Sequence, residues 1–212
     1  MLVGMSSQYR TAIAHLKRVD PVLGDVITRV GPCRLEVRRT GTHYDALVRS
    51  IVYQQLSGKA AGTILRRFCE LYPAKRPRAE LVLATDETLM RGAGLSRQKM
   101  GYLRDLSARV ADRSLPLAHL GRLHDDAIIE HLVQVKGIGR WTVQMFLMFR
   151  LGRPDVLPEL DLGVQNAIQR AYGLKQRPTP KDVLRIGEQW RPHASVASWY
   201  LWRSLENGDG QM

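Results

Sequence analysis

The sequence predicts an all-α protein made of two helical subdomains that flank a cleft. Apolar residues recur at three- and four-residue steps along most of the chain, which is the spacing of one buried helix face. Alternation with a period of two is weak everywhere except in the short segment 33–38. The 212 residues and the 44% hydrophobic share fit one compact domain or two small lobes with a proper core.

Each expected helix is marked by its apolar spacing or by a residue that favours a helix start. Apolar spacing predicts helices within 47–52, 61–68, 100–110, 128–135, 140–150 and 164–172. Residues that favour helix starts stand at Thr85, Ser96, Asp125 and Pro180. Glycine and proline separate these segments, so we expect short loops between the helices.

The charge balance points to a polyanionic partner. Lys and Arg number 32 against 20 Asp and Glu, which gives a net charge of +12. These basic residues are spread along segments that look folded, so they indicate a charged surface on a structured body. Nucleic acid is the commonest partner of so basic a protein, although some basic proteins bind none.

Several classes of protein are excluded by composition. No apolar stretch approaches the roughly 18 residues that would span a bilayer, and the N-terminus lacks the layout of a secretory signal. Two cysteines are too few for a disulfide framework, a four-thiolate zinc site or an iron–sulfur cluster. We therefore expect no membrane partner and an intracellular protein, cytoplasmic and associated with the nucleoid.

The most specific local pattern is a Gly-Ile-Gly turn between two expected helices, at residues 137–139. The two glycines let the backbone approach another molecule closely, and the following helix start favours an anion such as a phosphate. Lys136 and Arg140 add full positive charges on either side. A tight turn without a ligand is the plain alternative, but the basic flanks favour phosphate binding that does not read base sequence.

Five stretches together resemble the helix-hairpin-helix (HhH-GPD) DNA glycosylase superfamily, in its AlkA-type 3-methyladenine DNA glycosylase II branch. The chain is similar to a short form that lacks the extra N-terminal α/β domain of the larger enzymes. The matching stretches, in the order of the chain, are 47–57, 94–99, 135–142, 157–164 and 190–203. The resemblance implies a central subdomain at 43–153, with the helix-hairpin-helix at about 128–150, and a second subdomain from 1–42 and 154–212.

The resemblance places Asp161 at the position of the catalytic aspartate. A fixed negative charge beside the sugar stabilises the oxocarbenium-like transition state of N-glycosidic hydrolysis and can orient or deprotonate the water. The expected helix start at Leu162 stabilises that negative charge. Taken alone, an aspartate at a helix start is more often a capping residue, and both roles can coexist.

The residue after Arg140 separates two kinds of glycosylase. In the bifunctional relatives, the second residue after the last hairpin glycine is a lysine that forms a Schiff base with the sugar. Here that residue is Trp141, whose indole cannot form an imine. The resemblance therefore implies a monofunctional enzyme without lyase activity.

A glycosylase that flips a base needs a pocket for the base and a side chain that fills the gap in the duplex. The resemblance puts Trp141 and Trp202 in the base pocket, where an aromatic face attracts a cationic alkylated base, and Met145 beside them. Plain core packing is the alternative for each tryptophan. The DNA-binding residues implied by the resemblance are Gln54, Gln55, Leu56, Lys136, Gly137, Ile138, Gly139, Arg140 and Thr142, with Gln55 at the inserting position.

No cofactor is expected to be required. In the family, the hairpin often holds a monovalent cation through main-chain carbonyls, which by position are those of Val133, Val135 and Ile138. The sequence departs from the family at His193 and Ala194, where an aromatic residue and an arginine are usual. That departure leaves the contact of the missing arginine, and the substrate range, undecided.

The resemblance implies a monomeric glycosylase that removes bases of the 3-methyladenine and 7-methylguanine type from double-stranded DNA in base excision repair. Two alternatives stay open. One is a non-catalytic helix-hairpin-helix DNA-binding protein, which needs the hairpin glycines but not Asp161. The other is a glycosylase of the same superfamily that acts on other damaged or mismatched bases.

Overall fold

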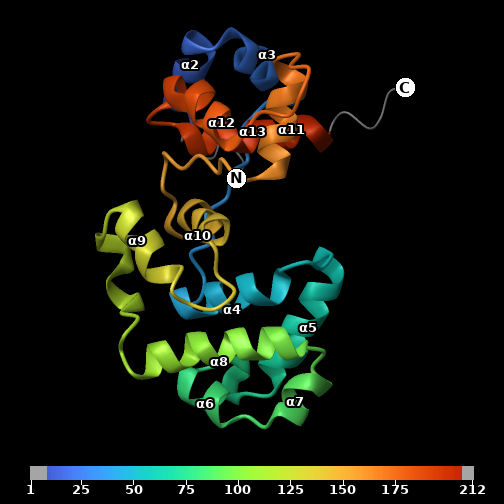
Figure 1. Ribbon diagram of the computed structural model, residues 1–212, viewed down its shortest axis with the longest axis vertical. Coiled ribbons are helices and arrows are strands. Elements are labelled where there is room, and N and C mark those ends of the chain that lie inside the picture. The colour runs from blue at the N-terminus through green and yellow to red at the C-terminus, as the bar shows by residue number, and fades with distance from the viewer. Residues whose placement is uncertain (1–8, 207–212) are drawn as a thin grey trace, which may run out of the picture. The chain divides into compact units, whose positions relative to one another are not determined.

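The computed structural model describes residues 9–206 and confirms the all-α prediction, with no strand among these residues. The described chain divides into two compact units (Figure 1). The hairpin unit is Arg39–Phe146, and the terminal unit holds the described residues up to Arg38 and from Leu147 onward. No helix of the described part is long and apolar enough to cross a membrane.

The chain crosses from one unit to the other after residue 38 and again after residue 146. The family resemblance places these two boundaries after residues 42 and 153. The second crossing falls where the expected helix 140–150 changes character, because α10 (Arg140–Phe146) continues as a π-helical turn, η3 (Leu147–Leu151). η3 is hydrogen-bonded to the N-terminal segment of the terminal unit, because the main-chain carbonyl of Phe149 accepts from the amide of Arg38 at 2.8 Å. This bonding places η3 in the terminal unit.

The hairpin unit is built around the long helix α8 (Arg97–Ala111), which packs against α4 (His43–Tyr53), α6 (Ala79–Ala84) and α7 (Glu87–Gly92). Its core holds fully buried side chains, among them Leu47, Ile51, Met90 and Leu103. The unit also contains α5 (Gly58–Glu70) and α9 (Asp125–Leu132), with short 3-10 turns η1 (Pro73–Lys75) and η2 (Leu117–Arg122).

Side-chain caps explain where several helices of the hairpin unit begin. The hydroxyl of Ser96 accepts from the amide of Lys99, as the sequence predicts for this start. The start expected at Thr85 is wrong by one residue, because the cap of α7 is Asp86, whose carboxylate accepts from the amide of Thr88 at 2.7 Å. The Thr85 hydroxyl instead donates to the carbonyl of Leu81.

The terminal unit packs helices from both ends of the chain around one core. The largest fully buried side chains there include Leu16, Leu23, Trp190 and Tyr200. Its helices are α2 (Arg10–Val19), α3 (Pro21–Val30), α11 (Leu162–Ala171), α12 (Pro180–Gly187) and α13 (Ala194–Glu206), with the 3-10 turn η4 (Glu188–Trp190).

A buried carboxylate, Asp20, joins three parts of the terminal unit. It is 2% exposed and caps α3 by accepting from the amide of Leu23. Its other oxygen accepts from Trp190 Nε1 at 2.7 Å, from Gln189 Nε2 and from the Tyr172 hydroxyl. Burial, and then the bond to Asp20, raise the pKa of Tyr172. These donors offset the cost of burying a carboxylate, so Asp20 stabilises this unit.

The weak period-two pattern at 33–38 corresponds to an extended segment without a partner strand. Cys33 and Leu35 are buried, whereas Arg34, Glu36 and Arg38 are exposed. The alternation in the sequence therefore reports the burial of one side of an extended chain.

Candidate active site and DNA-binding hairpin

The candidate catalytic residue Asp161 lies at the first turn of α11, at the end of the loop that follows Pro158. Its amide donates to the carbonyl of Pro158 at 3.0 Å. Its Oδ1 atom accepts from the amide of Val164 at 2.8 Å, so the side chain caps the helix. The capping role is thus present, and it holds the half-buried carboxylate at a helix N-terminus, where the dipole favours negative charge.

Trp202 of α13 makes a second hydrogen bond to the same carboxylate. Its Nε1 atom donates to Asp161 Oδ1 at 2.8 Å, across 41 residues of sequence. The indole stacks on the ring of Phe149, with centroids 5.9 Å apart and planes at 29°. Trp202 therefore positions the carboxylate, a role that the sequence did not indicate.

Gly163 makes this arrangement possible. A Cβ atom there would lie 3.0 Å from Asp161 Oδ1 and 3.0 Å from Trp202 Cδ1, closer than ordinary contact. The glycine after the helix start was visible in the sequence, but nothing local indicated that an indole would occupy the space. Leu160 and Leu162, the sequence neighbours of Asp161, are 48% and 57% exposed.

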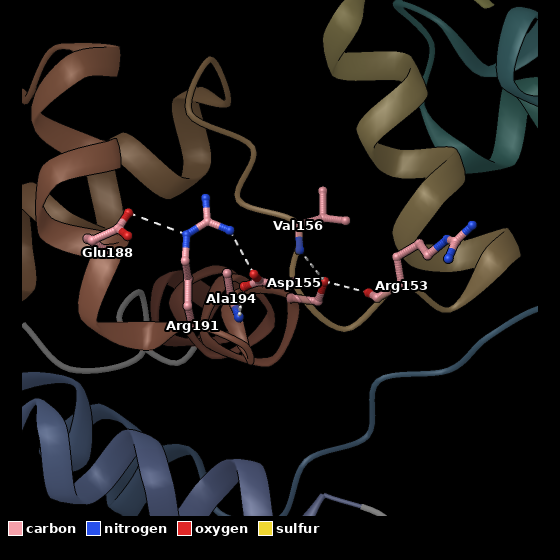
Figure 2. A network of polar contacts seen from close by, with 7 residues as sticks. Arg153, Asp155, Val156, Glu188, Arg191 and Ala194 are labelled. Carbon is pink, nitrogen blue, oxygen red and sulfur yellow. Dashed lines mark hydrogen bonds and ion pairs between the residues drawn. The ribbon is translucent and has the colours of Figure 1, made fainter. Parts of the chain in front are cut away.

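A polar network holds the segment that leads into this loop (Figure 2). The guanidinium of Arg191 lies between two carboxylates, bonded to Asp155 at 2.7 Å and to Glu188 at 3.3 Å. Asp155 also accepts from the amide of Ala194 at 3.3 Å. Ser195 Oγ donates to the carbonyl of Arg153 and accepts from the amide of Val156.

This network bears on the departure from the family at residues 193 and 194. Asp155 already has Arg191 as its ionic partner and the amide of Ala194 as a second donor. Ala194 is 2% exposed at the first position of α13. Arg191, which stands between Trp190 and Pro192, supplies the positive charge that pairs with the Asp155 carboxylate. 

The Gly-Ile-Gly hairpin lies between α9 and α10, with its charged and glycine residues outward. Lys136, Gly137, Gly139 and Arg140 are exposed, whereas Ile138 is only 3% exposed and anchors the turn. The amide of Ile138 donates to the carbonyl of Val135 at 3.0 Å, which closes the turn. Ile138, which the family resemblance places among the DNA-binding residues, is therefore buried in the turn and adds little to its exposed surface.

The two hairpin glycines have different surroundings. Gly137 has φ +80°, and a Cβ atom there would lie 2.2 Å from the Tyr102 ring, so the chain itself requires glycine. A Cβ atom at Gly139 would meet nothing within 4 Å. Glycine at position 139 is therefore not required by packing within this chain.

The segment Gln54–Leu56 lies next to the hairpin. Gln54 Nε2 donates to the carbonyl of Gly137 at 2.7 Å, across 83 residues of sequence. Gln55 is exposed and has φ +55°, and Leu56 is 39% exposed. The structure thus brings together two groups of residues predicted to bind DNA.

The predicted pocket residues of the hairpin unit lie on α10. Trp141 is 43% exposed, and Met145 is half-buried one turn later. Thr142 on the same helix, a predicted DNA-binding residue, is 7% exposed. Of the carbonyls expected to hold a cation, that of Val135 accepts from Ile138, and Val133 ends α9 with an exposed side chain. No cluster of acidic, histidine or cysteine side chains fit for a metal occurs within residues 9–206.

A Gly-Ile-Gly hairpin between two helices, followed later in the chain by an aspartate at a helix start, is the pattern of the helix-hairpin-helix glycosylases. The profile of the HhH-GPD superfamily base excision DNA repair proteins matches residues 48–193. This chain belongs to that superfamily, as the sequence predicts.

Individual relatives agree with this assignment. DNA-3-methyladenine glycosylase 1 of Schizosaccharomyces pombe is 36% identical over 168 residues, which cover 78% of this chain and 74% of the relative. YfjP of Bacillus subtilis (strain 168) is 36% identical over 169 residues, covering 77% of this chain, and the chain spans only 59% of that relative.

Solved structures show the same fold. The Schizosaccharomyces pombe 3-methyladenine DNA glycosylase in complex with abasic DNA superimposes with a TM-score of 0.83 at 32% identity. The match covers 95% of this chain and 100% of that one.

Proposed function

We propose that this protein is a monofunctional DNA glycosylase that removes alkylated bases of the 3-methyladenine and 7-methylguanine type in base excision repair. The observation that supports this most directly is the carboxylate of Asp161, held by the amide of Val164 and by the indole N–H of Trp202. The named activities of the relatives support the same substrate class.

In this proposal the carboxylate acts on the deoxyribose of a flipped nucleotide. As the N-glycosidic bond lengthens, positive charge develops on the sugar, and the fixed negative charge of Asp161 stabilises it. The base leaves with the electron pair of the broken bond, a water adds to the anomeric carbon, and the proton of that water passes to the Asp161 carboxylate. Alkylation makes the base a better leaving group and so lowers the activation barrier for cleavage of the N-glycosidic bond. The protein therefore needs to stabilise the transition state less.

The partner in this proposal is double-stranded DNA that contains damaged bases, bound by a monomer in the compartment that holds the chromosome. The exposed hairpin residues Lys136, Gly139 and Arg140 contact phosphates, which positions the protein without reading base sequence. Gln55, next to the hairpin, fills the gap that the flipped nucleotide leaves.

Three side chains are proposed to hold the extruded base. Trp141 and Trp202 offer aromatic faces that attract an electron-poor base, and Met145 lies one helical turn from Trp141. Trp202 has a second role in this proposal, because its indole N–H also holds the Asp161 carboxylate.

A monovalent cation, Na⁺ or K⁺, is proposed to bind at the hairpin through the main-chain carbonyls of Val133, Val135 and Ile138. Neutral carbonyl oxygens suit an ion of low charge density, and the carbonyl of Val135, which accepts one hydrogen bond, has a second lone pair. The ion would supply positive charge next to a DNA phosphate and take no part in the bond cleavage.

Base release from defined duplexes tests the function. The protein should release 3-methyladenine and 7-methylguanine from methylated duplex DNA, as measured by chromatography of the free bases, and leave unmodified bases in place. Duplexes that carry one hypoxanthine, 8-oxoguanine or mismatch test the other glycosylases of the superfamily in parallel. Binding to DNA without release of any base would instead support the non-catalytic DNA-binding alternative.

The proposal that the enzyme lacks lyase activity predicts no covalent adduct with DNA in the presence of sodium borohydride. An imine requires an amine nucleophile, and Trp141 stands where the bifunctional relatives have lysine. Abasic product should break only after alkali and heat, as seen on denaturing gels. A bifunctional glycosylase serves as the positive control. A trapped adduct that disappears in Lys136→Gln would contradict the proposal and locate the amine.

A further inference from the structure

Lys99, on the first turn of α8, reaches the end of a neighbouring helix. Its Nζ atom donates to the carbonyl of Val52 at 2.7 Å and to the carbonyl of Gln54 at 2.8 Å. These two carbonyls lie at the C-terminal end of α4, which packs beside α8 (Figure 1). Partial burial lowers the pKa of Lys99. The helix dipole and the two charge-assisted bonds offset the loss of hydration.

The bonds of Lys99 hold the residue that begins the predicted inserting segment. Gln54 is tied at its main chain to Lys99 and at its side chain to the hairpin carbonyl of Gly137, 2.7 Å away. The next residue, Gln55, has φ +55°, a backbone conformation that is uncommon outside glycine. Such a conformation persists only where surrounding interactions determine it, and here the two bonds of Gln54 do so.

We propose that Lys99 is a positioning residue that holds Gln54–Leu56 against the hairpin, so that Gln55 enters the duplex where the damaged nucleotide leaves it. Without the ammonium group, the carbonyls at the end of α4 lose their common donor, and Gln55 is released to ordinary negative φ values. Its side chain then points elsewhere, while the hairpin and the Asp161 loop keep their own hydrogen bonds. This inference rests on the proposed function, because it concerns how the same site opens a duplex.

A purely structural role for Lys99 makes a different prediction. Loss of general stability would lower activity on every substrate alike. Loss of positioning affects only steps that require insertion into a duplex, because a base in single-stranded DNA is already unpaired. Activity on duplex DNA compared with activity on single-stranded DNA therefore distinguishes a positioning role for Lys99 from a purely structural one.

The test compares Lys99→Met with the wild type and with Arg97→Met, which removes a positive charge from an exposed position of the same helix. Lys99→Met keeps the length of the side chain and removes its donors. The first measurement is the fluorescence of 2-aminopurine next to a stable abasic analogue in a duplex, which increases when a side chain is inserted and the bases unstack. We expect this increase with the wild type and Arg97→Met, and its loss with Lys99→Met at saturating protein.

The second measurement is single-turnover base release from methylated DNA. We expect Lys99→Met to be slower by at least about tenfold on the duplex, the size of effect that misplacement of a distant group produces. On the same strand without its complement, we expect rates within about twofold of the wild type. Equal losses on both substrates, or an unchanged fluorescence response, would overturn the inference.

These results also separate the inference from the proposed function. A wild-type protein that releases no base, but whose fluorescence response is lost in Lys99→Met, would refute the glycosylase and support the positioning role. Thermal unfolding establishes that the variant is folded at the assay temperature. If Lys99→Met does not fold, Lys99→Leu, which also lacks a side-chain donor, takes its place, and the same results support or overturn the inference.

Discussion

Asp161→Asn should lower base release from methylated duplex DNA by about 10²–10³-fold, the cost of removing one preorganised electrostatic group from such a site. The amide of Asn has no negative charge to stabilise the sugar cation and no basic oxygen to accept the proton of the water. Its carbonyl oxygen still accepts from the amide of Val164 and from Trp202, so the helix cap survives. Single-turnover kinetics measure the loss, and urea unfolding checks that the fold is retained.

The matched control is Asp86→Asn. Asp86 also caps a helix, α7, through a bond from a backbone amide, so this variant tests the loss of a capping carboxylate in the other unit of the chain. Base release should then be unchanged. If Asp161→Asn releases bases as fast as the wild type while it binds DNA equally well, Asp161 is only a cap and the catalytic assignment fails.

Gly137→Ala and Gly139→Ala should separate the stability of the hairpin from its contact with DNA. A methyl group at position 137 would lie 2.2–2.6 Å from three atoms of the Tyr102 ring, at φ +80°. The ring or the hairpin must move, and we expect a loss of about 2–4 kcal/mol in the free energy of unfolding, from overpacking and backbone strain. Urea unfolding measures it.

Gly139→Ala should leave the free energy of unfolding unchanged or raise it by up to about 1 kcal/mol, because nothing lies within 4 Å of the added carbon. A methyl group on this exposed turn hinders a phosphate, so affinity should fall by about tenfold, or 1.4 kcal/mol. The fall should be similar on damaged and undamaged duplexes, since phosphate contacts do not read the bases. Fluorescence anisotropy on both duplexes checks this. A loss confined to damaged sites would contradict the assignment.

Local signals in the sequence predicted most of the helices and the positions of the hairpin and the candidate aspartate. Ser96, Asp125 and Pro180 mark helix starts that the structure confirms, because the residue types preferred at the cap and in the first turn act within one turn of the chain. The short helices α6 and α7 have too few turns for a period to be measured. At the boundary between them, Thr85 and Asp86 are both residue types that cap helices, and only the structure shows that Asp86 is the cap.

The candidate site likewise has features that the sequence predicted and features that only the fold showed. The resemblance located Asp161 and Trp202 separately, but only the fold showed that Trp202 donates to Asp161 and that Gly163 leaves room for the indole. The same holds for Lys99, which belongs to a matching stretch but had no assigned role until its bonds to Val52 and Gln54 were seen.

The amino-acid sequence by itself determined the helical class, the basic charge, the exposed Gly-Ile-Gly turn and the aspartate at the start of α11. Each of these depends on composition or on residues within a few positions of one another. The tertiary structure decided which distant groups meet: Trp202 with Asp161, Gln54 with the Gly137 carbonyl, and the ring of Tyr102 with the Gly137 backbone. Hydrogen bonds between residues 41 and 83 positions apart leave no period or spacing in a sequence, because they form only when packing brings their helices together.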